Sequence, residues 1–434
     1  MTATMKKIVV FVLFLAVSLV ASAQTGDWSG KLNVQGTSLT LVLHLDADGC
    51  KVDSPDQGVR GIPAEASHTD LGKLVVSIPS IGATYEGFLL AGQLVGTFTQ
   101  NGVSFPLTLK PGVPKLNRPQ TPAEPFPYAT EEVSFANGDA VLKGTLTLPE
   151  DCNRNTPVLL MVTGSGLQNR DEEIFEHKPF AVIADALARA GIATLRYDDR
   201  GFGESTGDVV HCTTEDLKYD ALAGIRLLRE RFDRVGVIGH SEGGTIALML
   251  AAEKQADFIV SLAGMVISGE ETLLIQNRQV LALAGIPEAT VDTYCKALGE
   301  AFDAIIAGTD PPKADRFDLP EALRQNYQAV LVQSATPYMR FFLALDLRPQ
   351  LSAVSCPVLA LNGTKDFQVD PDKNLSALRA GLPANPDNRI LPVEGVNHLF
   401  QHCPTGNPNE YKDIEETFAP EALTTIIEWL KALR

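Results

Sequence analysis

The stretch Arg-Val-Gly-Val-Ile-Gly-His-Ser-Glu-Gly-Gly-Thr-Ile-Ala-Leu-Met-Leu, residues 234–250, changes its pattern at its centre. Residues 234–239 form an apolar run typical of a buried strand, and residues 243–253 are rich in Ala and Leu, which favour a helix. Between them, Gly239-His240-Ser241-Glu242-Gly243 matches the pattern G-x-S-x-G. We expect a tight, strained strand-to-helix turn, since a Cβ at either glycine would strike the strand or the helix. Ser241 would then project above the edge of the sheet.

The chain alternates strand and helix patterns from about residue 128 to its end. Apolar strand runs are expected at 157–162, 192–197, 234–239, 258–263, 357–361 and 389–393. One of the intervening helices is expected to begin at Thr213 or Thr214, which are good N-caps. This alternation predicts an α/β domain over 128–434, with a mainly parallel sheet and helices on both faces.

One interval of this domain departs from the alternation. Residues from about 268 to 350 have helical patterns throughout and no convincing strand. A helical insertion late in an α/β domain is typical of a lid that covers a site, although it can also be purely structural. We predict a helical lid over about 268–350.

The segment before this domain has a different residue pattern. Residues 24–112 contain short β-rich runs, two of which are joined by Asn101-Gly102, a strong hairpin signal. We predict a small antiparallel β domain there, either a sandwich or a barrel. Six prolines between Pro111 and Pro127 favour an extended spacer, so residues 113–127 are predicted to be a linker.

The N-terminus has the pattern of a targeting segment. Lys6 and Lys7 precede an apolar run over 8–21, and Ala21-Ser22-Ala23 ends it. This predicts a secretory signal peptide over 1–23 and export to the periplasm or the medium. The alternative is a membrane anchor, but the run is shorter than the roughly 20 residues that a membrane span needs. We found no second apolar run of that length, so no stable membrane span is expected after cleavage.

Composition excludes several classes of function. The 434 residues are 45% hydrophobic and 21% charged, which is ordinary for a globular protein. The net charge of −17 argues against binding to nucleic acid, whose backbone is also negative. None of the six cysteines forms a zinc-ligand pair, so we expect neither a metal nor a cofactor. The cysteines could form disulfides or remain buried thiols.

A serine nucleophile needs a base, and the base needs an orienting acid. Asp366 follows the strand run that ends at residue 361, and His398 follows the next run, at 389–393. Open α/β sheets build their sites at the carboxyl ends of the strands, which favours these two residues. Asp370 is the alternative acid, although it can instead cap a helix that begins at Pro371. His402 is the alternative base.

Acyl transfer also requires donors for the oxyanion of a tetrahedral intermediate. One should be the backbone N–H of Glu242, which follows the nucleophile. The other should come from Thr163-Gly164-Ser165-Gly166, whose small residues allow a close approach of the backbone after the strand run at 157–162. The N–H of Ser165 is the favoured donor, and that of Gly166 is the alternative.

Four motifs together resemble the α/β-hydrolase superfamily, and more narrowly the bacterial exported carboxylesterases grouped with serine aminopeptidase-like hydrolases. They are the loop Gly164-Ser165-Gly166, the run Leu195-Arg196-Tyr197-Asp198-Asp199-Arg200-Gly201-Phe202-Gly203-Glu204-Ser205, the Gly-His-Ser-Glu-Gly-Gly turn and Asn397-His398-Leu399-Phe400. The resemblance covers residues 128–434 and implies a triad of Ser241, Asp366 and His398. It also implies an internal ion pair for Arg200. Thr163 stands where such proteins often have His, which leaves the second oxyanion donor open.

Three functions fit these residues. The first is hydrolysis of small or medium acyl esters through an acyl-enzyme. The second is a serine aminopeptidase or prolyl-type peptidase with the same triad, for which Glu242 or Asp171 could hold the substrate amino group. The third belongs to another class: the β domain could contact a glycan or a protein, with Trp28 and Tyr85 as candidate stacking residues. A panel of acyl esters beside aminoacyl anilides would separate the first two.

Overall fold

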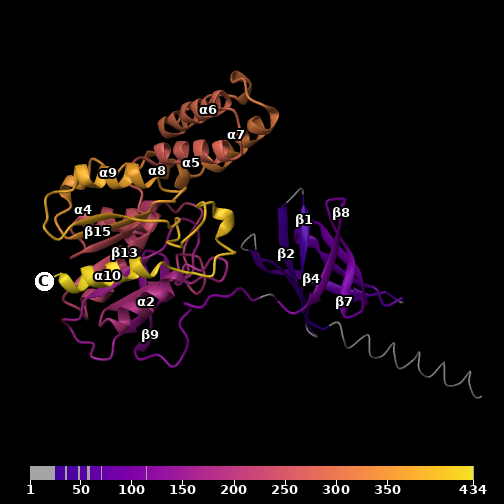
Figure 1. Ribbon diagram of the computed structural model, residues 1–434, viewed down its shortest axis with the longest axis horizontal. Coiled ribbons are helices and arrows are strands. Elements are labelled where there is room, and N and C mark those ends of the chain that lie inside the picture. Colours follow the sequence, from indigo (N-terminus) through magenta and orange to yellow (C-terminus); the bar gives the residue numbers. More distant parts are fainter. Residues whose placement is uncertain are drawn as a thin grey trace, which may run out of the picture. The chain divides into compact units, whose positions relative to one another are not determined.

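The structure is a computed structural model that describes residues 25–34, 37–46, 49–55, 59–69, 71–113 and 115–433. The predicted signal peptide, residues 1–23, lies outside the described residues. The chain divides into two compact units between Asn117 and Arg118, and each unit is described on its own (Figure 1). This boundary lies within the segment 113–127 that the sequence predicts as a linker.

The first unit is a closed antiparallel barrel in which each strand pairs with the next and the last pairs with the first. Its described strands are β1 (Gly26–Val34), β2 (Thr37–Asp46), β3 (Gly49–Ser54), β4 (Val59–His68), β5 (Leu74–Ile78), β6 (Ala83–Leu90), β7 (Gln93–Gln100) and β8 (Val103–Pro111). Asn101 and Gly102, both with positive φ, make the predicted hairpin turn between β7 and β8. Trp28 and Tyr85 are buried in the barrel core, so neither is a surface stacking residue.

The second unit is built on an eight-stranded sheet of order β16-β15-β14-β13-β11-β12-β10-β9. Its strands are β9 (Ala129–Asn137), β10 (Ala140–Leu148), β11 (Val158–Val162), β12 (Ala193–Tyr197), β13 (Val235–His240), β14 (Ile259–Leu262), β15 (Val358–Gly363) and β16 (Arg389–Val393). The strands from β11 to β16 pair in parallel, which confirms the predicted sheet. The antiparallel hairpin β9–β10 at one edge is an addition that the sequence patterns did not predict.

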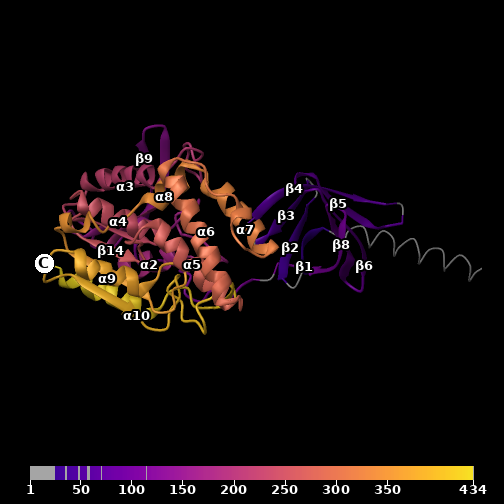
Figure 2. The same ribbon diagram turned by 90° about the horizontal axis from the view of Figure 1, so that it is seen from above.

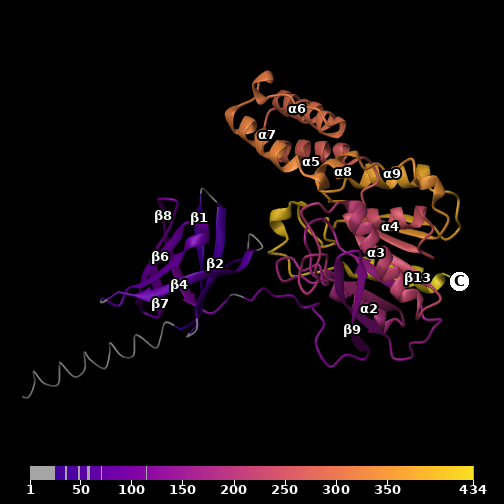
Figure 3. The ribbon, with the colours of Figure 1, turned by 180° about the vertical axis from the view of Figure 1, so that it is seen from behind.

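Helices cover both faces of this sheet (Figures 1 and 3). The helices around the sheet are α2 (Pro179–Arg189), α3 (Thr214–Arg229), α4 (Glu242–Ala252), α9 (Pro371–Gly381) and α10 (Pro420–Ala432). Alternate residues of β11 belong to two separate cores, one shared with α3, α4 and α9 and the other with α2 and α10. The fully apolar strands follow from this burial on both faces.

Two segments of the second unit refine the sequence predictions. Thr213 caps α3 in a reciprocal capping box with Asp216. Residues 118–120 of the predicted linker are fastened to the second unit, since the Arg118 guanidinium donates to three backbone carbonyls and Gln120 bonds the backbone at Thr417 and Phe418. This part of the proline-rich segment is therefore held by its side chains rather than acting as a free spacer.

The predicted helical insertion is confirmed (Figure 2). Residues 268–350 are all described and contain no strand; their helices are α5 (Gly269–Leu283), α6 (Glu288–Ala307), α7 (Glu321–Ser334) and α8 (Pro337–Ala344). These helices share a core of their own that includes Leu298, Phe302, Tyr327 and Leu343. The insertion therefore packs as a small helical bundle. Figure 1 shows α5, α6 and α7 stacked outward from α8.

The turn between β13 and α4 has the strained geometry that the sequence predicts. Ser241 has a φ of 51° and a ψ of −117°, which is unfavourable for a residue with a Cβ. A Cβ at Gly239 would lie 2.0 Å from the carbonyl oxygen of Gly243. A Cβ at Gly243 would lie 2.0 Å from the carbonyl oxygen of Val162. Both contacts are with backbone, which cannot move aside as a flexible side chain can, so both glycines are required.

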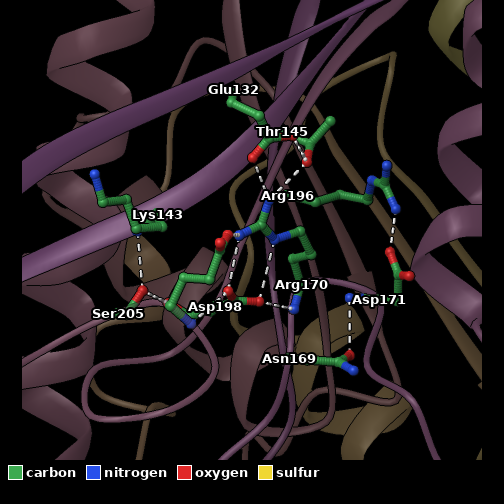
Figure 4. A network of polar contacts seen from close by, with 10 residues as sticks. Glu132, Lys143, Thr145, Asn169, Arg170, Asp171, Arg196, Asp198 and Ser205 are labelled. Atoms are coloured by element: carbon green, nitrogen blue, oxygen red, sulfur yellow. Dashed lines mark hydrogen bonds and ion pairs between the residues drawn. The ribbon is translucent and has the colours of Figure 1, made fainter.

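The loop that follows β11 is pinned by acidic residues that follow β12 (Figure 4). Arg170 of this loop bonds Asp198 through its backbone N–H and its guanidinium, which also reaches Glu132 and Thr145. The carboxylate of Asp199 accepts from the Thr163 hydroxyl at 2.7 Å and from the Gln168 N–H at 2.9 Å. These hydrogen bonds therefore fix the backbone of the loop from Thr163, its first residue, onward.

We expect two glycine-to-alanine substitutions in helices to change stability in opposite directions. Gly243→Ala in α4 should lower the free energy of unfolding by about 1–3 kcal/mol, because the new methyl group overpacks against the Val162 backbone. Gly299→Ala in α6 is the matched control. Its nearest neighbour is a leucine side-chain carbon 3.7 Å away, so the lower backbone entropy of alanine should stabilise by about 0.5–1 kcal/mol. Denaturant unfolding measures both, and equal effects would contradict this account.

We expect the Asp199 carboxyl to reduce stability as the pH rises. Burial raises its pKa to about 8, an effect that the hydrogen bonds from Thr163 and Gln168 offset only in part. In the unfolded chain this group ionises near about pH 4. Between these two pKa values the folded protein binds one proton more than the unfolded chain. The stabilisation that this proton provides is lost as the pH increases. Asp199→Asn should therefore gain in melting temperature relative to the wild type between pH 5 and pH 8.

The surface variant Asp233→Asn serves as a control for the loss of a charge, since Asp233 pairs with Arg154 in an exposed position. If the difference between wild type and Asp199→Asn did not change with pH, the raised pKa of Asp199 would be wrong.

Candidate active site

Ser241 stands at the point where β13 ends and α4 begins. Its backbone N–H donates to the carbonyl of Leu262 at 2.8 Å, and its side chain is half-buried. The first N–H groups of α4 have no partner within the helix, so this terminus attracts negative charge. The serine hydroxyl therefore lies where an anion that forms beside it would be stabilised.

Asp366 and His398 are bonded to each other. Asp366 follows β15 and His398 follows β16, and Nδ1 of His398 lies 2.8 Å from Oδ2 of Asp366. The other carboxylate oxygen of Asp366 accepts the N–H groups of Gln368 and Val369, at 2.7 and 2.9 Å. Both side chains are almost fully buried. This arrangement fixes the orientation of the imidazole and directs Nε2 away from the carboxylate.

His398 contacts His240, the residue that precedes Ser241. Nε2 of His240 lies 2.9 Å from the backbone carbonyl oxygen of His398, and the two imidazole centroids are 4.7 Å apart. Among the described contacts, the Ser241 hydroxyl makes no hydrogen bond to His398. The structure thus brings Asp366 and His398 into contact and sets His398 beside the residue that precedes Ser241. Such bonds to a nucleophile often tighten only when substrate binds.

The loop with the candidate oxyanion donors lies against Ser241. A Cβ at Gly164 would be 3.3 Å from the Cβ of Ser241. The Gly164 N–H donates to the Glu172 carboxylate at 2.6 Å and is therefore occupied. In this described loop and turn, no contact occupies the N–H of Ser165, Gly166 or Glu242. These three groups remain the candidate donors.

The rival residues have other roles. Asp370 caps α9, where its carboxylate accepts the N–H of Lys373 at 2.8 Å. His402 is half-exposed and pairs with Glu416 and Glu421. Asp366 and His398 bond each other, and His398 contacts His240, the residue before Ser241, so the geometry favours Asp366 over Asp370 and His398 over His402.

Two carboxylates proposed to hold a substrate amino group already have partners. Asp171 forms an ion pair with Arg196 and lies 3.7 Å from the ammonium group of Lys178. Glu242 is buried, and burial raises the pKa of its carboxyl. It accepts a hydrogen bond from the Thr214 hydroxyl at 2.6 Å and another from the Tyr338 hydroxyl of α8 at 2.7 Å.

Sequence reasoning missed two residues of this site. Glu172 lies in a run of acidic residues that is typical of an exposed loop, yet it is 5% exposed and bonds Nδ1 of His240 at 2.9 Å. Tyr338 carries no signal in the sequence apart from its place in the insertion. The structure does confirm the ion pair implied for Arg200, which bonds Asp220 through two nitrogens.

All six cysteines lie in the described part of the chain, and their thiols are unpaired. The described helices include none with both the length and the apolar character that a membrane crossing requires.

Comparison with known proteins gives one family and several relatives. The family model described as "Serine aminopeptidase, S33" matches residues 176–401, which is more than half of the chain. The esterase EstD of Thermotoga maritima is 29% identical over 287 residues, which are 63% of this chain and 62% of that protein. The chain thus spans less than two thirds of the length of this relative.

Solved structures give weaker likenesses. An esterase of Pyrococcus furiosus has a TM-score of 0.46 at 17% identity, with 74% of this chain and 98% of that chain covered. A proline iminopeptidase of Mycobacterium smegmatis has a TM-score of 0.43 at 18% identity, with 69% and 98% covered.

The sheet order, the strained serine turn and the extent of the family match agree on one assignment. The chain belongs to the serine aminopeptidase S33 family of α/β-hydrolases.

Proposed function

We propose that this protein is a serine hydrolase that cleaves carboxylic esters of small molecules through an acyl-enzyme intermediate. Ser241 is the nucleophile, His398 the general base and Asp366 the acid that orients it. The observation that carries the proposal is the buried bond between Asp366 and His398 beside a serine in a strained strand-to-helix turn. A neutral hydroxyl needs such a base to become nucleophilic at neutral pH.

The reaction has two halves. Nε2 of His398 takes the proton of the Ser241 hydroxyl as its oxygen attacks the ester carbonyl, and the N–H groups of Glu242 and of Ser165 or Gly166 stabilise the oxyanion. The protonated imidazole then gives its proton to the departing alcohol, which leaves an acyl-enzyme. In the second half a water molecule, activated by the same imidazole, releases the acid.

An ester is favoured over a peptide as substrate for a structural reason. Glu242 accepts two hydroxyl groups and Asp171 pairs with Arg196, so neither carboxylate is left to bind a substrate amino group. The relative named esterase EstD agrees with this choice. An aminopeptidase or prolyl-type peptidase with the same triad is the alternative that the substrate panel below tests.

We propose three further assignments. The helical insertion acts as the lid of the site, since Tyr338 of α8 bonds Glu242 at the serine turn. The chain is exported, because residues 1–23 have the pattern of a signal peptide. The exposed face of the barrel is the place for a glycan or protein contact.

Removal of the triad groups should abolish turnover of an activated ester such as p-nitrophenyl butyrate. We expect Ser241→Ala and His398→Ala to lower kcat by about 10⁴–10⁶-fold, and Asp366→Asn by about 10⁴-fold, because each removes a group that acts in the transition state. Circular dichroism checks that the variants fold.

The rival residues provide matched controls for two of these changes. His402→Ala and Asp370→Asn alter the same residue types four positions away and should retain kcat within about twofold. If His402→Ala were inactive and His398→Ala active, the assignment of the base would be wrong.

The bond class can be tested with a panel of p-nitrophenyl esters of increasing acyl length beside aminoacyl and prolyl anilides. We expect kcat/KM for the best ester to exceed that for every anilide by at least about 10²-fold, because Glu242 and Asp171 already have partners and are not free to bind the amino group. A higher kcat/KM for an aminoacyl or prolyl anilide would make the protein a peptidase.

A further inference from the structure

A second carboxylate–imidazole pair lies beside the Asp366–His398 pair. Glu172, in the loop after β11, and His240, at the end of β13, are both buried, and Oε1 of Glu172 lies 2.9 Å from Nδ1 of His240. Neither residue has a role in the proposed reaction. Their contacts, however, lead to two segments that do.

The first contact leads to the loop with the oxyanion donors. Oε1 of Glu172 also accepts the N–H of Gly164 at 2.6 Å, next to the candidate donors Ser165 and Gly166. A Cβ at Gly164 would lie 3.2 Å from this oxygen, 3.6 Å from Nδ1 of His240 and 3.3 Å from the Cβ of Ser241. At Gly164 the loop thus passes through a narrow space between Glu172, His240 and Ser241.

The second contact leads to the loop with the base. Nε2 of His240 lies 2.9 Å from the backbone carbonyl oxygen of His398. A carbonyl can only accept, so Nε2 of His240 carries a proton and donates it. With Nδ1 facing the Glu172 carboxylate, the imidazole is held at both nitrogens. Burial alone lowers the pKa of His240, but the charge and hydrogen bond of Glu172 raise it overall, which favours the doubly protonated ring.

The surroundings of the pair are apolar. Glu172 and His240 line a small pocket whose other walls are Pro179, Phe180, Ile183, Leu262, Leu399 and Phe418. Hydrogen bonds in such a low-dielectric space are stronger than in water, and a partner left without its bond costs more. The pair therefore resists displacement.

We propose that Glu172 and His240 are positioning residues. They fix the loop after β11, which carries the candidate oxyanion donors, relative to the loop after β16, which carries His398. Glu172 acts through the Gly164 N–H, and His240 acts through the His398 carbonyl. This inference rests on the proposed function, because it assigns a role relative to that reaction. It predicts that loss of either residue weakens stabilisation of the transition state and leaves the binding of the ester unchanged.

The test uses the full chain with Glu172→Ala, Glu172→Gln and His240→Ala. A displacement of about 1 Å at reacting groups can cost about 10²-fold. We therefore expect Glu172→Ala and His240→Ala to lower kcat by about 10–10²-fold, with KM within about twofold. Glu172→Gln should recover most of kcat, because its amide oxygen still accepts the Gly164 N–H.

A second measurement separates positioning from a general loss of structure. The affinity of an alkyl boronic acid, which forms a tetrahedral adduct with the serine, should fall in the same proportion as kcat. The double variant Glu172→Ala/His240→Ala should lose no more than about threefold beyond the worse single variant, since the two residues act as one unit. Asp220→Asn is the matched control: this buried carboxylate bonds Arg200 instead, and its removal should lower the melting temperature but leave kcat and the boronic acid affinity unchanged.

Three outcomes would overturn the proposal. These are a folded Glu172→Ala or His240→Ala variant with wild-type kcat and boronic acid affinity, a loss confined to KM, and losses that multiply in the double variant. Should Glu172→Ala fail to fold, the same criteria apply to His240→Ala, and Glu172→Gln must still retain most of kcat. Ser241→Ala is measured alongside. If it retains turnover, the proposed function itself fails and this inference with it; if it is inactive while Glu172→Ala behaves as wild type, only the positioning role fails.

Discussion

The site depends on a serine held at a backbone geometry that residues with a Cβ avoid. Ser241 has a φ of 51°, and nothing local favours that conformation. It is maintained because β13, α4 and the end of β11 approach so closely that only glycine fits at residues 239 and 243. Packing of the apolar sheet on both faces provides the free energy that offsets this strain.

The loops around this turn are held mainly by buried carboxylates. Asp199 holds the start of the loop after β11, Glu172 holds Gly164, and Asp366 holds His398. Each accepts at least two hydrogen bonds, which reduces the cost of removing the group from water. Asp366 has two backbone N–H donors besides the imidazole, and Asp199 has a hydroxyl and one N–H. Burial raises the pKa of Asp199 to about 8, because its two hydrogen bonds offset the effect of burial only in part.

Much of the fold and the candidate residues could be predicted, because they depend on local patterns. Apolar runs of five or six residues predicted the parallel strands, and Asn101-Gly102 predicted the hairpin turn between β7 and β8. Glu172 was missed since its burial depends on partners at Gly164 and His240, which lie 8 and 68 residues away. The edge strand β9 was missed because most of its residues are exposed and leave no apolar pattern. The roles of Ser241, Asp366 and His398 stay predictions.

The helical insertion is not independent of the serine turn. Glu242 supplies a candidate oxyanion N–H from its backbone, and its carboxylate accepts the hydroxyl of Tyr338 from α8. The partners of this carboxylate are neutral hydroxyl groups, so burial raises its pKa with no cation to oppose the shift. The Tyr338–Glu242 hydrogen bond therefore connects α8 directly to the first turn of α4. The insertion has a core of its own, but Phe341 and Phe342 of α8 also pack against the core of the sheet, so α8 joins the helical bundle to the domain that carries Ser241.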